Sequence, residues 1–111
     1  TSRDFCFIDN AVQANLLAAT TQNAEAKNQV YNVAVGDRTT LNDLFNAIQS
    51  ALIENGVNYA KQAVHRDFRP GDVRHSQADV SKAETLLGYA PEFRIMEGIA
   101  KAMPWYVRFL K

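Results

Sequence analysis

A chain of 111 residues with 12 basic and 12 acidic side chains carries no net charge when both histidines are neutral, and its length suits a single domain. Zero net charge gives no general attraction to nucleic acid or anionic lipid, so neither is expected as a partner. A single cysteine excludes an internal disulfide, and no apolar run approaches the ~20 residues of a membrane span. We therefore expect a soluble, cytoplasmic protein.

The N-terminal part alternates strand-like and helix-like segments. Residues 5–8 form a short apolar run that predicts a strand, with Cys6 as a buried structural thiol within it. Helical spacing of apolar residues predicts a helix over 10–20, followed by a polar loop. Residues 30–35 are rich in β-branched and aromatic side chains and predict a second strand.

The clearest predicted element is the helix that follows. Thr40 and Asp43 resemble a capping box, with Asp in place of the commoner Glu. Asn55 and Gly56 predict the end of this helix. Between them, apolar residues at helical spacing form one continuous stripe: Leu41, Leu44, Phe45, Ile48 and Leu52.

The C-terminal part is predicted to be mostly helical. Residues 59–64 alternate weakly and predict an edge strand, and 65–78 form a polar loop. Asp79 is expected to cap a short helix that ends at Leu87, with Gly88 in a left-handed conformation. A last helix contains Pro104, which should kink it, and its apolar residues are Met96, Ile99, Ala100, Met103, Val107 and Leu110.

Several kinds of chemistry find no support in the residues. The five glycines form neither a dinucleotide-binding loop nor a phosphate-binding P-loop. His65 and His75 could be combined with Asp67 and Asp72 into a metal site, but their spacing fits no ligand signature. The polarity of a loop explains all four, so no metal is expected.

The segment Arg69-Pro70-Gly71-Asp72 permits two interpretations. It places a guanidinium, whose planar donors suit phosphate oxygens, in a rigid turn beside a carboxylate that could accept bonds from paired hydroxyls. Binding of a phosphate and a ribose would need this pair of groups. The alternative is a solvated loop with surface ion pairs, which the residues alone favour.

Five segments in order resemble one known family. Residues 69–76, 79–83 and 87–91 resemble the C-terminal signature of nucleotide-sugar epimerases and dehydratases, which are extended short-chain dehydrogenase/reductases. Residues 2–9 and 30–36 match two further family segments. The resemblance covers essentially the whole chain.

Within that family, the chain's ending, at 102–106 and 109–111, is similar to the bacterial UDP-N-acetylglucosamine 4-epimerases. The resemblance implies an α/β fold (α+β if the strands do not pair in parallel), with a few short strands and about four helices. Residues 1–111 would then be one C-terminal substrate-binding domain, without the N-terminal Rossmann domain.

The family's binding residues can be carried over where the motifs match. The resemblance implies that Arg69 and Arg3 contact the pyrophosphate of a UDP-sugar and that Asp72 accepts bonds from the uridine ribose hydroxyls. Leu41 would pack near the nucleoside. These four residues are the expected substrate-binding residues.

The resemblance begins at Thr1, part-way through a family segment, so we expect a fragment of a longer chain. The family's glycine loop and its catalytic Ser, Tyr and Lys have no counterpart here. The chain is therefore expected to hold no cofactor and no catalytic residue, and NAD is implied for the full-length parent. The leading hypothesis is the UDP-sugar-binding portion of an NAD-dependent 4-epimerase, inactive alone.

Two other interpretations remain open from the sequence. The chain could be a stand-alone, non-enzymatic binding or assembly module, or a degradation product without a role. In any of these cases we expect self-association, as a homodimer or larger, because apolar groups in residues 5–8 and at Trp105 and Phe109 would otherwise face water.

Overall fold

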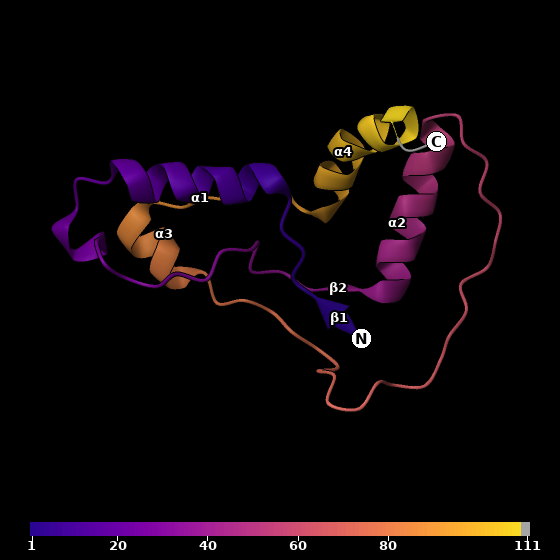
Figure 1. The fold of residues 1–111 in the computed structure, drawn as a ribbon, viewed down its shortest axis with the longest axis horizontal. Coiled ribbons are helices and arrows are strands. Elements are labelled where there is room, and N and C mark those ends of the chain that lie inside the picture. Colours follow the sequence, from indigo (N-terminus) through magenta and orange to yellow (C-terminus); the bar gives the residue numbers. More distant parts are fainter. Residues whose placement is uncertain (110–111) are drawn as a thin grey trace.

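The computed structural model describes residues 1–109, which form an α/β fold of four helices and one pair of short strands (Figure 1). The molecule is long and flat, with extents of 52 × 35 × 18 Å. Its elements in chain order are β1 (Ser2–Arg3), α1 (Ile8–Thr20), a 3-10 turn η1 (Ala24–Ala26), β2 (Thr39–Thr40), α2 (Leu41–Glu54), α3 (Ser81–Leu87) and α4 (Ile95–Phe109).

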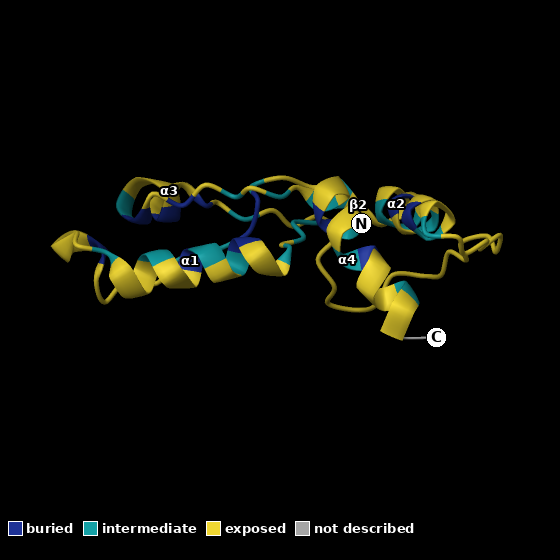
Figure 2. Cartoon of the chain, turned by 90° about the horizontal axis from the view of Figure 1, so that it is seen from above, coloured by how far each residue is buried: buried dark blue, intermediate teal, exposed yellow. Residues whose placement is uncertain are grey.

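The main hydrophobic core lies between α1 and α3. Ala14 of α1 and Ala83 of α3 are both buried, and the other buried residues of this core lie outside the two helices: Ala34, Val80 and Tyr89. Figure 2 shows this buried layer where the two helices face each other, with exposed residues on their outer faces. The Tyr89 hydroxyl donates to the Ala34 carbonyl at 2.5 Å, so the largest core side chain leaves no polar atom unpaired.

Helix α2 forms as its sequence predicts. The Thr40 hydroxyl accepts a hydrogen bond from the Asp43 amide at 3.1 Å, which confirms the predicted cap. The helix ends at Glu54, and Gly56 follows with a φ of 81°. The helix packs against α4, and Ile48 and Leu52 of its apolar stripe line a hollow together with residues of that helix, whereas Leu41 stays exposed.

The predicted strands are wrong in three places. Residues 5–8 form an extended connection that enters α1 at Ile8, and neither 30–35 nor 59–64 contains a strand. The named strands pair antiparallel, Ser2 with Thr40 and Arg3 with Thr39. A strand needs a neighbouring strand for its backbone groups, and in 30–35 part of that need is met by a side chain.

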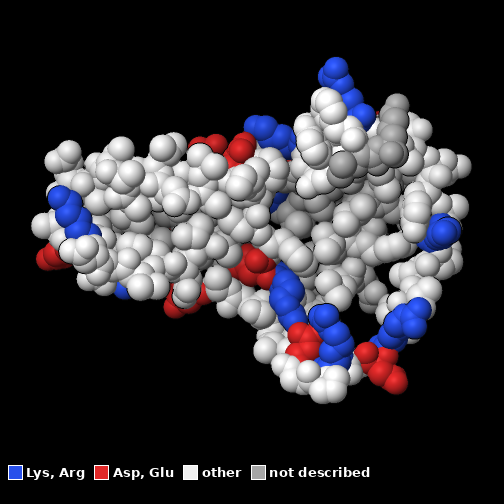
Figure 3. Space-filling view, viewed as in Figure 1, with Lys and Arg blue, Asp and Glu red and all other residues white. Residues whose placement is uncertain are grey.

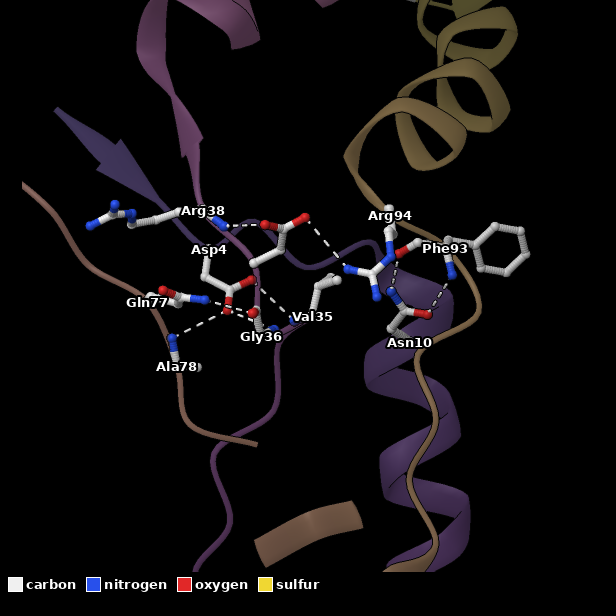
Figure 4. Close-up of polar contacts among 10 residues, drawn as sticks. Asp4, Asn10, Val35, Gly36, Arg38, Gln77, Ala78, Phe93 and Arg94 are labelled. Carbon is white, nitrogen blue, oxygen red and sulfur yellow. Dashed lines mark hydrogen bonds and ion pairs between the residues drawn. The ribbon is translucent and has the colours of Figure 1, made fainter. Parts of the chain in front are cut away.

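That side chain is Asp4, whose carboxylate connects three parts of the chain (Figure 4). One oxygen accepts from the Val35 amide at 3.0 Å, and the other accepts from Gly36 at 2.9 Å and Ala78 at 3.2 Å. The carboxylate thus joins segments far apart in sequence to the residue that follows β1.

A second connection is made by Asn10, a fully buried residue of α1. Its side-chain oxygen accepts from the amides of Glu92 and Phe93, and its side-chain nitrogen donates to the Phe93 carbonyl at 2.6 Å (Figure 4). These bonds fix the start of α1 against the segment that leads into α4.

The prediction of a buried Cys6 is also wrong, because this side chain is exposed. In the extended connection burial alternates: Phe5 and Phe7 are half-buried and Cys6 lies between them on the opposite side. Phe7 packs edge-on against Phe93, with ring centroids 5.3 Å apart. This apolar run therefore shelters its two aromatic residues more than the cysteine between them.

The two ends of α3 agree with the sequence. Asp79 accepts from the Ser81 amide at 3.0 Å at the start of α3, and Gly88 ends that helix with a φ of 71°. Pro104 lies inside α4, and the kink expected there stays a prediction. The expected apolar position Leu110 lies outside the described residues.

Candidate functional site

A pocket of about 750 Å³ lies between β1, the N-terminal end of α2 and the long loop that follows α2. The loop runs wide of α2 before it returns past β1 (Figure 1). All four residues expected to bind substrate line this one pocket: Arg3, Leu41, Arg69 and Asp72. The fold thus brings together residues from three separate segments.

Arg3 is held firmly in position on β1. Its Nη1 donates to the carbonyls of Ser2 at 2.7 Å and Arg74 at 3.4 Å, and its Nη2 donates to Asp72 Oδ1 at 2.9 Å. Its side chain is 29% exposed. The guanidinium is therefore fixed by backbone groups and still faces the pocket.

Arg69 and Asp72 stand at the two ends of a tight turn. The Asp72 amide donates to the Arg69 carbonyl at 3.1 Å, and Gly71 between them has a φ of 77°, which favours glycine. Arg69 Nη2 lies 3.2 Å from Asp72 Oδ2. Because Arg69 is 85% exposed and Asp72 30% exposed, the arginine extends into solvent from a more sheltered carboxylate.

The carboxylate of Asp72 therefore bridges two guanidiniums, with one oxygen bound to each. Two arginines held side by side by one carboxylate form a place where an anion with several oxygens can bind in bidentate fashion. Figure 3 shows acidic and basic side chains gathered along the part of the surface formed by the long loop.

The pocket wall also contains apolar and aromatic side chains. Leu41 opens α2, with its amide donating to the Thr1 carbonyl at 3.0 Å, and its side chain is half-exposed. Phe5 and Phe45 are half-buried beside it. Across the pocket lies Phe68, whose ring lies 4.3 Å from the Arg74 guanidinium carbon. A flat apolar group such as a nucleobase would find contacts here.

Sequence reasoning missed the contact that ties the long loop to α2. His65 Nε2 lies 2.9 Å from Asn42 Oδ1, and both residues line the pocket. A histidine in a polar loop and an asparagine in a helix carry no shared motif, so no signal in the sequence points to this pair. Phe68 was missed for the same reason.

The two histidines take part in separate contacts, not in a metal site. His75 Nδ1 lies 2.7 Å from the hydroxyl of the buried Ser2. Desolvation, followed by the positive charges of the N-terminus and Arg38, lowers the pKa of His75. Within residues 1–109, no three His, Cys, Asp or Glu side chains gather in a way that would hold a metal ion.

The length and composition of a helix decide whether it can span a membrane. In the part of the chain that the structure describes, no helix combines the length and the apolar character that crossing a bilayer requires.

Comparison with known proteins gives consistent matches along the chain. The model of the family described as GDP-mannose 4,6 dehydratase matches residues 1–102. A putative UDP-glucose 4-epimerase of Methanocaldococcus jannaschii is 31% identical over 104 residues, which cover 94% of this chain and 30% of the relative. The UDP-glucose 4-epimerase of Mycolicibacterium smegmatis is 30% identical, over 95% of this chain and 31% of its own length.

Solved structures agree with these relatives. The UDP-glucose 4-epimerase of Thermotoga maritima, solved with UDP-glucose, matches with a TM-score of 0.82 and 33% identity, over 99% of this chain and 33% of that one. A UDP-glucuronic acid 4-epimerase mutant from Bacillus cereus, in complex with a fluorinated UDP-sugar and NAD, matches with a TM-score of 0.77 and 25% identity, again over 99% and 33%. The chain thus spans about a third of the length of the relatives it matches.

Proposed function

Because the chain belongs to the family described as GDP-mannose 4,6 dehydratase, we propose that it is the UDP-sugar-binding portion of a nucleotide-sugar 4-epimerase. One observation carries the proposal: the guanidiniums of Arg3 and Arg69 meet at Asp72 on the wall of a single pocket. The long loop supplies Arg69 and Asp72, and β1 supplies Arg3.

Each group of the pocket suits one part of a nucleoside diphosphate. Arg3 and Arg69 offer paired N–H donors to the diphosphate oxygens, since guanidiniums bind phosphate in bidentate fashion. Asp72 offers two acceptor oxygens to the two hydroxyls of the ribose. Leu41 and Phe45 offer apolar contact to the base.

The sugar of the substrate is the finer part of the proposal. We assign it to the UDP-N-acetylglucosamine type, on the similarity of residues 102–106 to that group of epimerases. The whole protein would invert the configuration at C4 of the sugar with the help of NAD. This chain would contribute binding energy from the nucleotide, which orients the sugar for reaction.

The residues described here do not fit NAD. Gly36, Gly56, Gly71 and Gly88 have positive φ values, but they lie in separate turns and helix ends and form no continuous cradle at a helix N-terminus. We therefore derive no chemical step through NAD from these residues. A test follows: the 111-residue chain incubated with NAD and a UDP-sugar should show no epimerised product.

The binding proposal is tested with Arg69→Ala in the complete protein. A charge-assisted bond to phosphate is worth about 1.5–3 kcal/mol, so the dissociation constant for a UDP-sugar should rise by roughly tenfold to a hundredfold. Isothermal titration calorimetry measures this change. Lys61→Ala is the matched control, because Lys61 is exposed in the same loop and does not line the pocket.

An affinity unchanged by Arg69→Ala would instead support the solvated loop with surface ion pairs. Equal losses in Arg69→Ala and Lys61→Ala would show that only the general charge of the loop matters, and this would also contradict the proposal.

We also propose that the chain associates with itself. Trp105, Tyr106 and Phe109 of α4 are all more than half exposed, and the Trp105 ring packs against the rings of the other two. Each large apolar side chain removed from water gains about 1.5–3 kcal/mol. The residues 5–8 expected to share this role form no open strand edge, so the proposal rests on α4. Light scattering tests it, and a mass near 12.4 kDa would refute it.

A further inference from the structure

We propose that Asp72 acts as an internal counter-anion in this pocket. It excludes simple phosphates, and it releases the two arginines only to a ligand that carries both a diphosphate and a sugar diol. This inference rests on the proposed function and adds a selectivity mechanism to it. It concerns competition inside the pocket, not the identity of the contacts.

The geometry shows both oxygens of Asp72 in use before any ligand arrives. Oδ1 lies 2.9 Å from Arg3 Nη2, and Oδ2 lies 3.2 Å from Arg69 Nη2. An anion that approaches the guanidiniums must therefore replace a carboxylate that already neutralises them. The anion must also approach the charge of that carboxylate, which repels it.

The two arginines differ in how easily they can be released. Arg3 keeps its bonds to the Ser2 and Arg74 carbonyls when it loses Asp72. For the guanidinium of Arg69, Asp72 is the polar partner found among residues 1–109, and the side chain is otherwise surrounded by water. Arg69 is thus the group that swings from the carboxylate to a phosphate.

Once the arginines leave Asp72, its carboxylate needs other hydrogen-bond donors. A ligand that supplies such donors is favoured over one that does not, and this difference makes the pocket selective. Inorganic pyrophosphate has no pair of neighbouring sugar hydroxyls to offer as donors, so it does not replace the two partners that Asp72 loses. A ribose offers two O–H donors that can replace the two lost N–H donors. A nucleoside diphosphate therefore compensates Asp72, whereas a bare anion does not.

The formal charges of the pocket agree with this role. Its lining contains three arginines, Arg3, Arg66 and Arg69, and two aspartates, Asp67 and Asp72. Asp43, in the first turn of α2, has the same charge as Asp72 but is exposed, does not line the pocket and makes no ion pair among the described residues. Asp43→Asn is therefore a matched control that removes the same charge outside the pocket without freeing an arginine.

The experiment compares binding of inorganic pyrophosphate and of UDP to the complete protein by calorimetry at constant ionic strength. In Asp72→Asn, the affinity for pyrophosphate should rise by about threefold to tenfold, because one competing charge is gone. The affinity for UDP should fall by about fivefold or more, because an amide offers the ribose one acceptor oxygen in place of two. Asp43→Asn should change both affinities by less than about twofold.

Asp72→Ser, which also removes the charge, should shift pyrophosphate binding in the same direction and guards against a misfolded asparagine variant. A pyrophosphate affinity that is unchanged or weaker in both Asp72 variants would overturn the inference, since Asp72 would then only hold the arginines together. An equal gain in Asp43→Asn would overturn it as well. If the unaltered protein binds neither UDP nor pyrophosphate, the proposed function itself fails, which is a distinguishable result.

Discussion

Replacing Asp4 by alanine should destabilise the fold more than any other single change of a partly exposed carboxylate. The Asp4 carboxylate accepts three backbone N–H bonds of 2.9–3.2 Å, from Val35, Gly36 and Ala78. Alanine removes all three acceptors and leaves partly buried amides without partners.

The size of the effect follows from this count. A hydrogen bond to a charged group contributes about 1.5–3 kcal/mol, but three bonds share one carboxylate that water partly reaches. We therefore expect Asp4→Ala to lower the free energy of unfolding by about 2–4 kcal/mol, out of a total of roughly 5–15 kcal/mol. For a domain of this size the Tm should fall by about 10–20 °C.

Urea and thermal denaturation followed by circular dichroism measure this loss. Asp4→Asn should give an intermediate value, because an amide keeps one acceptor oxygen. Asp37→Ala is the control: its side chain is 62% exposed and pairs with Arg94 at 3.5 Å, so its effect should stay within about 0.5 kcal/mol. The reasoning fails if Asp4→Ala unfolds within about 0.5 kcal/mol of the unaltered protein, or no more easily than Asp37→Ala.

Three further results are expected. Gly98→Ala should lower the free energy of unfolding by about 1–2 kcal/mol in a denaturation experiment, because the added Cβ would lie 2.9 Å from the Phe7 Cβ. Alanine favours helices more than glycine does, so a gain in stability would contradict this packing. Burial raises the pKa of Tyr89 to about 12, so ultraviolet titration should show one late-ionising phenol; stability should fall between about pH 10 and 12, where only the unfolded phenol ionises. Partial burial, and then the charge of Asp4, raise the pKa of Cys6. Iodoacetamide should therefore modify this thiol more slowly in the folded protein at pH 8 than in the unfolded protein at the same pH. Equal rates of modification in the two states would refute this.

Features that depend on neighbouring residues could be predicted from the sequence. The cap of α2 needs only Thr40 and the amide three residues later, and both follow from the chain's order. The left-handed end of α3 at Gly88 needs only the absence of a Cβ. The order of the four helices was predicted for the same reason, since apolar periodicity is a local property.

The candidate site could be predicted only in part. The family resemblance pointed to Arg3, Leu41, Arg69 and Asp72, and these residues do line one pocket. The residues alone favoured a solvated loop for Arg69, because no pattern shows that Arg3 lies 2.9 Å from a carboxylate 69 positions away. Long-range proximity of this kind depends on the path of the backbone.

The sequence by itself determined where the helices lie and where α2 and α3 are capped, and it indicated the loop of residues 65–78 as the candidate for phosphate binding. Only the tertiary structure decided the conformation of residues 30–35, which have a β-like pattern but no partner strand. At the end of this segment, the amides of Val35 and Gly36 donate to the Asp4 carboxylate instead. The tertiary structure also turned Cys6 outward and brought two arginines to one aspartate. The physical reason is the same in each case: strand pairing, burial and charge pairing are satisfied by distant groups, whereas helix formation and capping are satisfied within a few residues.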